Sequence, residues 1–207
     1  MFISPSLLAA DFSNLRQELD RVQTADALHI DIMDGHFVPN LSIGPGLMQS
    51  IRPYTELPFD VHLMVTHPLA YIDPFVDAGA QYLSFHPEAE DDPGTVIRAI
   101  QARGALPGLA LKPDTAPEVV FPYADDLHFV LILSVEPGFG GQTLMPQTLE
   151  KAKALRAHCP QLLLELDGGV NRETRVLCGD MDILVAGTGI FRAEHPAEEI
   201  AFLRGKH

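Results

Sequence analysis

Apolar residues gather in short runs along the chain, and most of these runs are rich in Val, Ile, Leu and Phe. Runs of this kind are typical of strands that are buried on both faces of a parallel sheet. The sequence therefore predicts eight strands, at Phe2–Pro5, Ala27–Met33, Phe59–Met64, Tyr82–Phe85, Leu106–Leu111, Phe129–Ser134, Leu162–Asp167 and Ile183–Ala186.

The segments between these runs carry apolar residues at helical spacing. After the first strand, Leu15, Leu19 and Val22 recur every three or four residues, which places them on one face of a helix. Phe12, one turn earlier, extends the same face. Further helices are predicted at Pro45–Ile51, Pro68–Ala78, Pro93–Arg103, Pro117–Tyr123, Pro146–His158, Arg172–Cys178 and Ala197–Leu203.

Strands and helices thus alternate eight times. This alternation predicts an α/β fold with a parallel sheet covered by helices. Eight repeats favour a sheet closed into a (β/α)₈ TIM barrel over an open sheet. No internal repeat or linker is evident, so residues 1–207 are expected to form a single barrel domain.

Polar side chains interrupt the apolar pattern near the C-terminal ends of the predicted strands, where the chemistry of such barrels takes place. Side chains alternate along a strand, so His29 and Asp31 share one face. A carboxylate buried without a partner is costly, and this pair therefore suggests either a metal or a hydrogen-bonded network. His62 and Asp167 complete a reasonable ligand set for a divalent ion. The polar residues at strand ends are Ser6, His29, Asp31, His62, His86, Ser134 and Asp167.

Glycine-rich stretches follow the last three predicted strands, at Gly138–Gly141, Gly168–Gly169 and Gly187–Gly189. Glycine lets backbone amides approach an anion closely, and the loops after strands seven and eight often bind phosphate in this fold. One such stretch alone would be interpreted as a tight turn, but three on adjacent strands favour an anion site. None matches a dinucleotide fingerprint or a P-loop, so the predicted ligand is a small phosphorylated substrate.

Composition narrows the class of protein further. Hydrophobic residues make up 46% of the 207 residues and charged residues 20%, which suits a chain with a full core. The formal net charge of −14 argues against nucleic acid or an anionic membrane as a partner. No run of about 18 apolar residues and no signal peptide is evident. Cys159 and Cys178 lack metal-like spacing and are expected to be reduced thiols in a cytoplasmic protein.

Taken together, these motifs resemble the ribulose-phosphate 3-epimerase family. The resemblance covers nearly the whole chain and is carried by residues 3–12, 29–40, 60–64, 134–142 and 167–170. It implies a metal-dependent isomerase that reversibly inverts C3 of D-ribulose 5-phosphate, giving D-xylulose 5-phosphate in the pentose phosphate pathway. It also implies a homo-oligomer, from dimer to hexamer.

The resemblance also implies roles for individual residues. It implies one divalent metal per subunit, held by His29, Asp31, His62 and Asp167, with zinc as the first candidate and iron, manganese or cobalt as alternatives. The implied substrate-binding residues are Ser6, Met33, His62, Met64, Gly138, Phe139, Gly140, Gly141, Asp167, Gly168, Gly169, Gly187 and Thr188.

Inversion beside a carbonyl needs a base on one face of the carbon and an acid on the other. We hypothesise that Asp31 and Asp167 form this pair, and the resemblance assigns Asp31 to the ribulose direction. The sequence does not decide the roles of Asp34, His36 and His86. Asp34 is as well suited to cap the following loop as to take a direct catalytic role.

Two departures from the family pattern leave alternatives open. Leu133 stands where the family usually has methionine, and Gly187–Gly189 replaces its usual Gly-Ser-Ala. The second departure resembles the sibling family that acts on D-allulose 6-phosphate, and this activity is therefore an alternative. A lyase on the same barrel is a rival, but Met33 stands where the related decarboxylases need lysine. A non-catalytic phosphosugar-binding protein is the remaining alternative.

Overall fold

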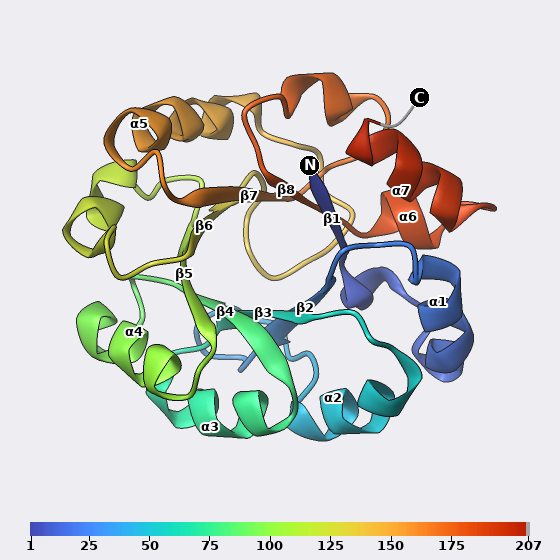
Figure 1. Cartoon of the computed structure of the whole chain (residues 1–207), viewed down its shortest axis with the longest axis horizontal. Coiled ribbons are helices and arrows are strands. Elements are labelled where there is room, and N and C mark those ends of the chain that lie inside the picture. Colours follow the sequence, from blue (N-terminus) through green and yellow to red (C-terminus); the bar gives the residue numbers. More distant parts are fainter. Residues whose placement is uncertain (206–207) are drawn as a thin grey trace.

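Eight parallel strands form the centre of the computed structural model, which describes residues 1–205 (Figure 1). Neighbouring strands follow the order β1-β8-β7-β6-β5-β4-β3-β2, and a parallel bridge between Ser6 and His29 joins β1 to β2. The predicted (β/α)₈ barrel is therefore confirmed. The strands are β1 Phe2–Pro5, β2 Leu28–Met33, β3 Phe59–Met64, β4 Ala80–Phe85, β5 Leu106–Leu111, β6 Phe129–Leu133, β7 Leu163–Asp167 and β8 Ile183–Ala186.

Helices surround the strands on the outside of the ring (Figure 1). The α-helices are α1 Leu15–Val22, α2 Pro45–Ile51, α3 Leu69–Asp77, α4 Pro93–Ala102, α5 Glu150–His158, α6 Thr188–Phe191 and α7 Pro196–Arg204. The 3₁₀ helices are η1 Leu7–Ala9, η2 Phe12–Asn14, η3 Arg52–Tyr54, η4 Pro117–Tyr123, η5 Pro146–Leu149 and η6 Thr174–Leu177. Positions 206–207 of the predicted domain lie outside the described residues. Over residues 1–205, no helix has the length and apolar character needed to cross a membrane.

Three predicted helices differ from the structure. The segment Arg172–Cys178 holds only the short η6, because the Asn171 side chain accepts hydrogen bonds from the backbone N–H groups of Glu173 and Thr174 and offers the chain a turn instead of a helix. The segment Pro117–Tyr123 is a 3₁₀ helix that contains Pro122, which lacks an N–H donor. The segment Pro146–His158 divides into η5 and α5.

The predicted stripe of the first helix is also shorter than expected. Leu19 and Val22 are buried, whereas Phe12 is 44% exposed and lies in η2. Asp11 accepts hydrogen bonds from the backbone N–H and the hydroxyl of Ser13, which fixes a tight turn before α1 begins.

Both faces of β2 and β3 are buried, since helices cover the outside of the barrel and side chains fill the inside. On β2, Leu28, Ile30 and Ile32 belong to the main apolar core, and His29 and Asp31 alternate with them. A second apolar cluster contains Ala110, Phe129, Leu131 and Leu133 of β5 and β6. Phe129 packs directly on Gly108, where an added Cβ would lie 2.4 Å from its ring. The polar residues of β2, β3 and β7 therefore share the barrel with an apolar cluster on β5 and β6.

Candidate active site

A cavity of about 730 Å³ lies at the C-terminal ends of the strands. It is lined by every residue for which sequence analysis predicts a substrate contact, and by Asp31. His29 is fully buried and is not among the lining residues. The glycine-rich segments after β6, β7 and β8 form one side of the cavity, and the ends of β2 and β3 form another.

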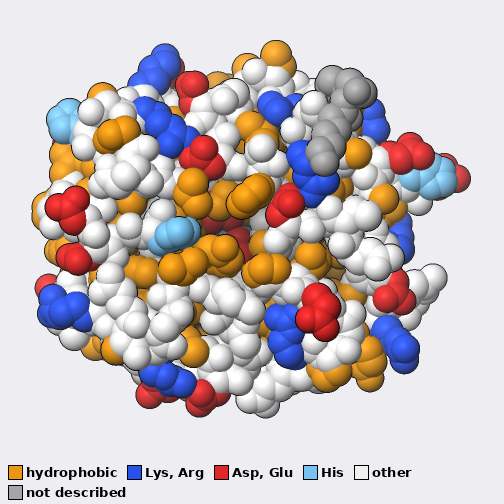
Figure 2. All heavy atoms as spheres, viewed as in Figure 1, with side chains coloured by type: hydrophobic (Ala, Val, Ile, Leu, Met, Phe, Trp, Pro, Cys, Tyr) orange, Lys and Arg blue, Asp and Glu red, His pale blue; other side chains and the backbone are white. Residues whose placement is uncertain are grey.

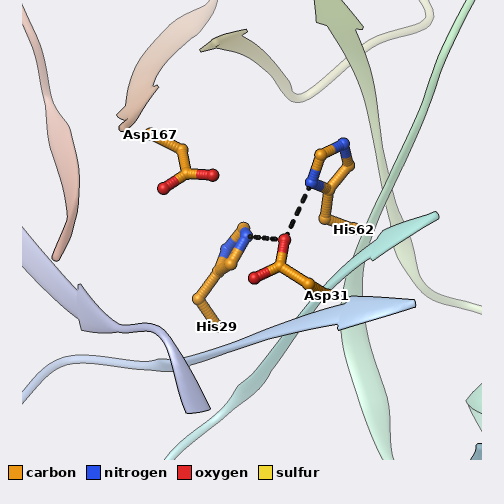
Figure 3. A group of neighbouring side chains, drawn as sticks. All are labelled: His29, Asp31, His62 and Asp167. Carbon is orange, nitrogen blue, oxygen red and sulfur yellow. Dashed lines mark hydrogen bonds and ion pairs between the residues drawn. The ribbon is translucent and has the colours of Figure 1, made fainter. Parts of the chain in front are cut away.

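Four side chains from three strands converge beside this cavity (Figure 3). His29 and Asp31 come from β2, His62 from β3 and Asp167 from β7, and each offers one ligand atom within 4.8 Å of the others. Asp31 and His62 are register partners on adjacent parallel strands. Oδ1 of Asp31 lies 3.1 Å from Nδ1 of His62 and 3.3 Å from Nε2 of His29. The strand pattern thus brings together all four predicted metal ligands.

The two carboxylates of this group have opposite pKa shifts. Burial raises the pKa of Asp31, but the charges and hydrogen bonds of His29 and His62 outweigh burial and hold it well below the usual range. For Asp167, burial and the nearby charge of Asp31 raise the pKa to about 7. One carboxylate is therefore held ionised, while the other can carry a proton near neutral pH.

The donor set fits a divalent cation. Nε2 of His29 is a buried atom without a hydrogen-bond partner in the described part of the chain, and it faces Asp31. Burial lowers the pKa of His29, but the charges of Asp60 and Asp31 raise it well above the ordinary value, so this position favours a positive charge. Two imidazoles and two carboxylates are ligands that zinc and related metals accept.

Further predicted residues surround the four. The hydroxyl of Ser6 donates to Oδ2 of Asp31 at 3.0 Å. Met33 and Met64 are buried in a small apolar cluster with Val38, and Leu8 and Phe37 pack against it. This cluster forms an apolar wall beside the carboxylates.

The comparisons with known proteins agree with this geometry. The model of the ribulose-phosphate 3 epimerase family matches residues 2–191. The chain belongs to this family. The cytoplasmic isoform of ribulose-phosphate 3-epimerase from Oryza sativa subsp. japonica is 46% identical over 210 residues, which cover 98% of the chain and 92% of the relative. Ribulose-phosphate 3-epimerase from Bacillus subtilis (strain 168) is 42% identical over 212 residues, which cover 98% of each protein.

Solved structures support the barrel fold. The structure of KGPDC from Streptococcus mutans in complex with D-R5P has a TM-score of 0.75 at 16% identity and covers 99% of this chain and 96% of that protein. A mutant tryptophan synthase α-subunit from Pyrococcus furiosus has a TM-score of 0.68 at 16% identity and covers 100% and 97%. The predicted enzyme class, an epimerase acting on carbohydrates, is confirmed by the family, and the family also decides against the rival lyase.

The three residues without an assigned role have different surroundings in this epimerase-family chain. Asp34 accepts hydrogen bonds from the backbone N–H groups of His36, Phe37 and Thr66, so it caps the loop after β2. The side chain of His36 contacts the backbone of Asp34 and is exposed. His86 is buried, and its Nε2 lies 2.9 Å from Nε2 of His62.

Sequence analysis did not single out several residues at this site. Asp60 and Glu165 are buried beneath the four converging side chains, and strand alternation places them on the same faces as His62 and Asp167. A cavity of about 60 Å³ reaches them from the first residues of the strands, among them Phe2. Figure 2 shows acidic side chains in a hollow near the centre of the molecule.

Sequence analysis also did not single out Arg192, which follows α6 and lines the large cavity. No apolar periodicity predicted this short helix.

Proposed function

We propose that the chain reversibly inverts C3 of D-ribulose 5-phosphate to give D-xylulose 5-phosphate. The observation that carries this proposal is the pair Asp31 and Asp167, whose carboxylates face one cavity from β2 and β7. Proton transfer at a carbon beside a carbonyl needs an ionised base and a protonated acid.

In the proposed reaction, ionised Asp31 removes the C3 proton of ribulose 5-phosphate, and an enediolate forms. Asp167 then delivers a proton to the opposite face of C3. The Ser6 hydroxyl, hydrogen-bonded to Asp31, holds this carboxylate in position. The apolar cluster of Met33, Val38 and Met64 keeps water away from the reacting atoms.

We further propose that His29, Asp31, His62 and Asp167 hold one divalent metal, with zinc as the first candidate and iron, manganese or cobalt as alternatives. Such an ion acts as a Lewis acid that stabilises negative charge on the oxygens of an enediolate. The support is the close approach of the four ligand atoms and the unpartnered Nε2 of His29.

The substrate phosphate is proposed to bind between the glycine-rich segments. Gly138, Gly141, Gly168 and Gly169 all have positive φ angles and line the cavity. Arg192 also lines it and supplies a positive charge in a strongly acidic chain. We propose that Phe139, Gly140, Gly187 and Thr188, which line the same end, complete the substrate contacts.

Gly169→Ala is expected to lower both stability and phosphate affinity, whereas Gly179→Ala, which lies outside the cavity lining, is expected to be tolerated. Gly169 has φ +65°, and an added Cβ would lie 2.3 Å from the backbone nitrogen of Leu144. The left-handed backbone alone costs an L-residue about 1–2 kcal/mol. An added Cβ at Gly179 meets nothing within 4 Å, and its φ angle is not positive.

Thermal melting and steady-state kinetics would measure this difference. We expect Gly169→Ala to lower Tm by more than about 4 °C, since each kcal/mol shifts Tm of a chain of this size by about 2–4 °C. We expect KM to rise about tenfold through a displaced charge-assisted hydrogen bond. Equal Tm and KM for the two variants would contradict the proposed packing of this loop.

A side-by-side assay tests the substrate. Ribulose 5-phosphate is expected to be the better substrate by kcat/KM, and D-allulose 6-phosphate is the alternative, because Gly187–Gly189 departs from the usual pattern of the pentulose enzymes. A higher kcat/KM for allulose 6-phosphate would transfer the proposal to the hexulose enzyme. Absence of turnover of both sugars, together with saturable binding, would favour a non-catalytic phosphosugar-binding protein.

The remaining proposals concern the cellular setting. We propose a role in the pentose phosphate pathway and a cytoplasmic location, supported by the family and by the rice relative, which is named as a cytoplasmic isoform. A homo-oligomer and a single domain over residues 1–207 also stay predictions.

A further inference from the structure

The two histidines of the proposed metal site each use one ring nitrogen away from the cluster of ligand atoms. Nδ1 of His29 lies 2.7 Å from Oδ2 of Asp60, and both side chains are buried. A carboxylate accepts hydrogen bonds, so Nδ1 of His29 carries the hydrogen in this contact. The opposite nitrogen, Nε2, faces Asp31 and Asp167.

His62 has the reverse arrangement. Its Nδ1 faces Oδ1 of Asp31 at 3.1 Å, and its Nε2 lies 2.9 Å from Nε2 of His86. Two imidazole nitrogens at this distance share one hydrogen, because two N–H groups would repel each other. When His62 donates that hydrogen to His86, its Nδ1 presents a lone pair to the cluster.

We propose that Asp60 and His86 are positioning residues that set the metal-binding tautomers of His29 and His62. This inference rests on the proposed metal site. Asp60 holds the hydrogen of His29 on Nδ1 and leaves Nε2 for the ion. His86 holds the hydrogen of His62 on Nε2 and leaves Nδ1. The partner of a ligand histidine fixes both its tautomer and its ring orientation.

Both partners are themselves held in place. Asp60 also accepts a hydrogen bond from the hydroxyl of Ser4 at 3.2 Å. The ring of His86 packs on Phe37, with ring centroids 4.8 Å apart. Nδ1 of His86 makes no direct hydrogen bond within residues 1–205 and lies 3.7 Å from a carboxylate oxygen of Glu88. The negative charge of Glu88 is on the Nδ1 side of the ring, which suits a hydrogen on Nδ1 and a lone pair on Nε2.

The same assignment explains a second cluster of possible ligands, formed by His29, Asp60 and Glu165. Nδ1 of His29 is 2.7 Å from Asp60 and 3.7 Å from Oε1 of Glu165. Because this nitrogen carries a hydrogen, it cannot also bind an ion. The second cluster is therefore not a separate metal site, and Asp60 acts in it as the hydrogen-bond partner of His29.

Substitutions of the two partners should change metal affinity. We would measure the dissociation constants for Co²⁺ and Zn²⁺ by chelator competition, and the visible spectrum of the Co²⁺ form. Asp60→Leu and His86→Leu each remove the hydrogen-bonding group and are expected to weaken metal binding by about 10–100-fold, the range typical for hydrogen-bond partners of ligand histidines. His86→Gln keeps an acceptor oxygen and is expected to restore most of the affinity that His86→Leu loses.

Ser84→Ala is the matched control. Ser84 is buried on β4 opposite His62, and its hydroxyl has no hydrogen-bond partner in residues 1–205. This substitution removes a buried polar group from the neighbouring strand without changing a tautomer, so metal affinity and the Co²⁺ spectrum should stay at wild-type values.

Nitrogen-15 NMR of the wild-type Zn²⁺ form provides a test that does not depend on the folding of any variant. Hydrogens on Nδ1 of His29 and on Nε2 of His62 are expected, and the opposite tautomer at either residue would overturn the inference. Unchanged metal affinity and Co²⁺ spectrum in Asp60→Leu and His86→Leu would also overturn the inference. Loss of metal in His62→Ala would then show that the metal site exists without these positioning residues. If His62→Ala retains metal with wild-type affinity, the proposed metal site fails instead.

Discussion

Metal-replete Asp167→Asn is expected to exchange the C3 hydrogen of ribulose 5-phosphate with solvent deuterium while making little xylulose 5-phosphate. Asp31 would still remove and return a hydrogen on its own face of C3, whereas the opposite face would lack its acid. Deuterium should therefore enter with retention of configuration. Loss of one acid–base group should lower net epimerisation by about 10²–10⁴-fold. Proton NMR in deuterium oxide follows both processes in one sample.

Asp31→Asn is expected to show the mirror behaviour and to exchange the C3 hydrogen of xylulose 5-phosphate. Both aspartates are also proposed metal ligands, so metal content must be measured in each sample. Asp92→Asn is the matched control. Asp92 caps the N-terminus of α4 and does not line the cavity, and asparagine caps helices as well as aspartate does. The control should epimerise at the wild-type rate.

Two outcomes would refute the pair. Near-normal epimerisation in either metal-replete variant would remove that aspartate from the mechanism. A single-base mechanism predicts that one variant loses exchange from both epimers while the other only slows turnover. The expected complementary pattern requires one group on each face of C3.

The convergence of the four proposed ligands could be predicted from sequence because strands have a period of two. His29 and Asp31 had to share a face of β2, and a buried face with a carboxylate demanded a partner. The order of strands in the barrel then brought β3 beside β2, and the register placed Asp31 opposite His62. Asp167 followed from the rule that the C-terminal strand ends face one mouth.

Other features depend on contacts that sequence spacing does not encode. Asp60 shares a face with His62, as the alternation showed, but only the folded barrel places its carboxylate 2.7 Å from His29. The segment Arg172–Cys178 looked helical, yet local hydrogen bonds from Asn171 outweigh its propensity, and Val176 is left 82% exposed. Arg192 follows the short α6, which has too few turns to show a period.

His62→Ala is expected to lose metal and activity together. The substitution removes one of four proposed ligands and also the imidazole that lies 3.1 Å from Asp31. A bound Lewis acid stabilises the transition state by several kcal/mol, and about 4 kcal/mol corresponds to roughly 10³-fold in rate. We therefore expect kcat/KM to fall about 10³-fold at low metal concentration.

The matched control is His36→Ala, since His36 is an exposed histidine in the loop after β2. Within residues 1–205, the only hydrogen bond of its ring is to the backbone carbonyl of Asp34. Metal content and kcat/KM of this variant should therefore stay within about twofold of wild type. Elemental analysis after dialysis, together with the epimerase assay, separates the two variants. Treatment of the wild type with a chelator should reproduce the His62→Ala defect, and added Zn²⁺, Mn²⁺ or Co²⁺ should reverse it in the wild type alone. Full activity in a metal-free His62→Ala protein would show that the two aspartates work without the ion.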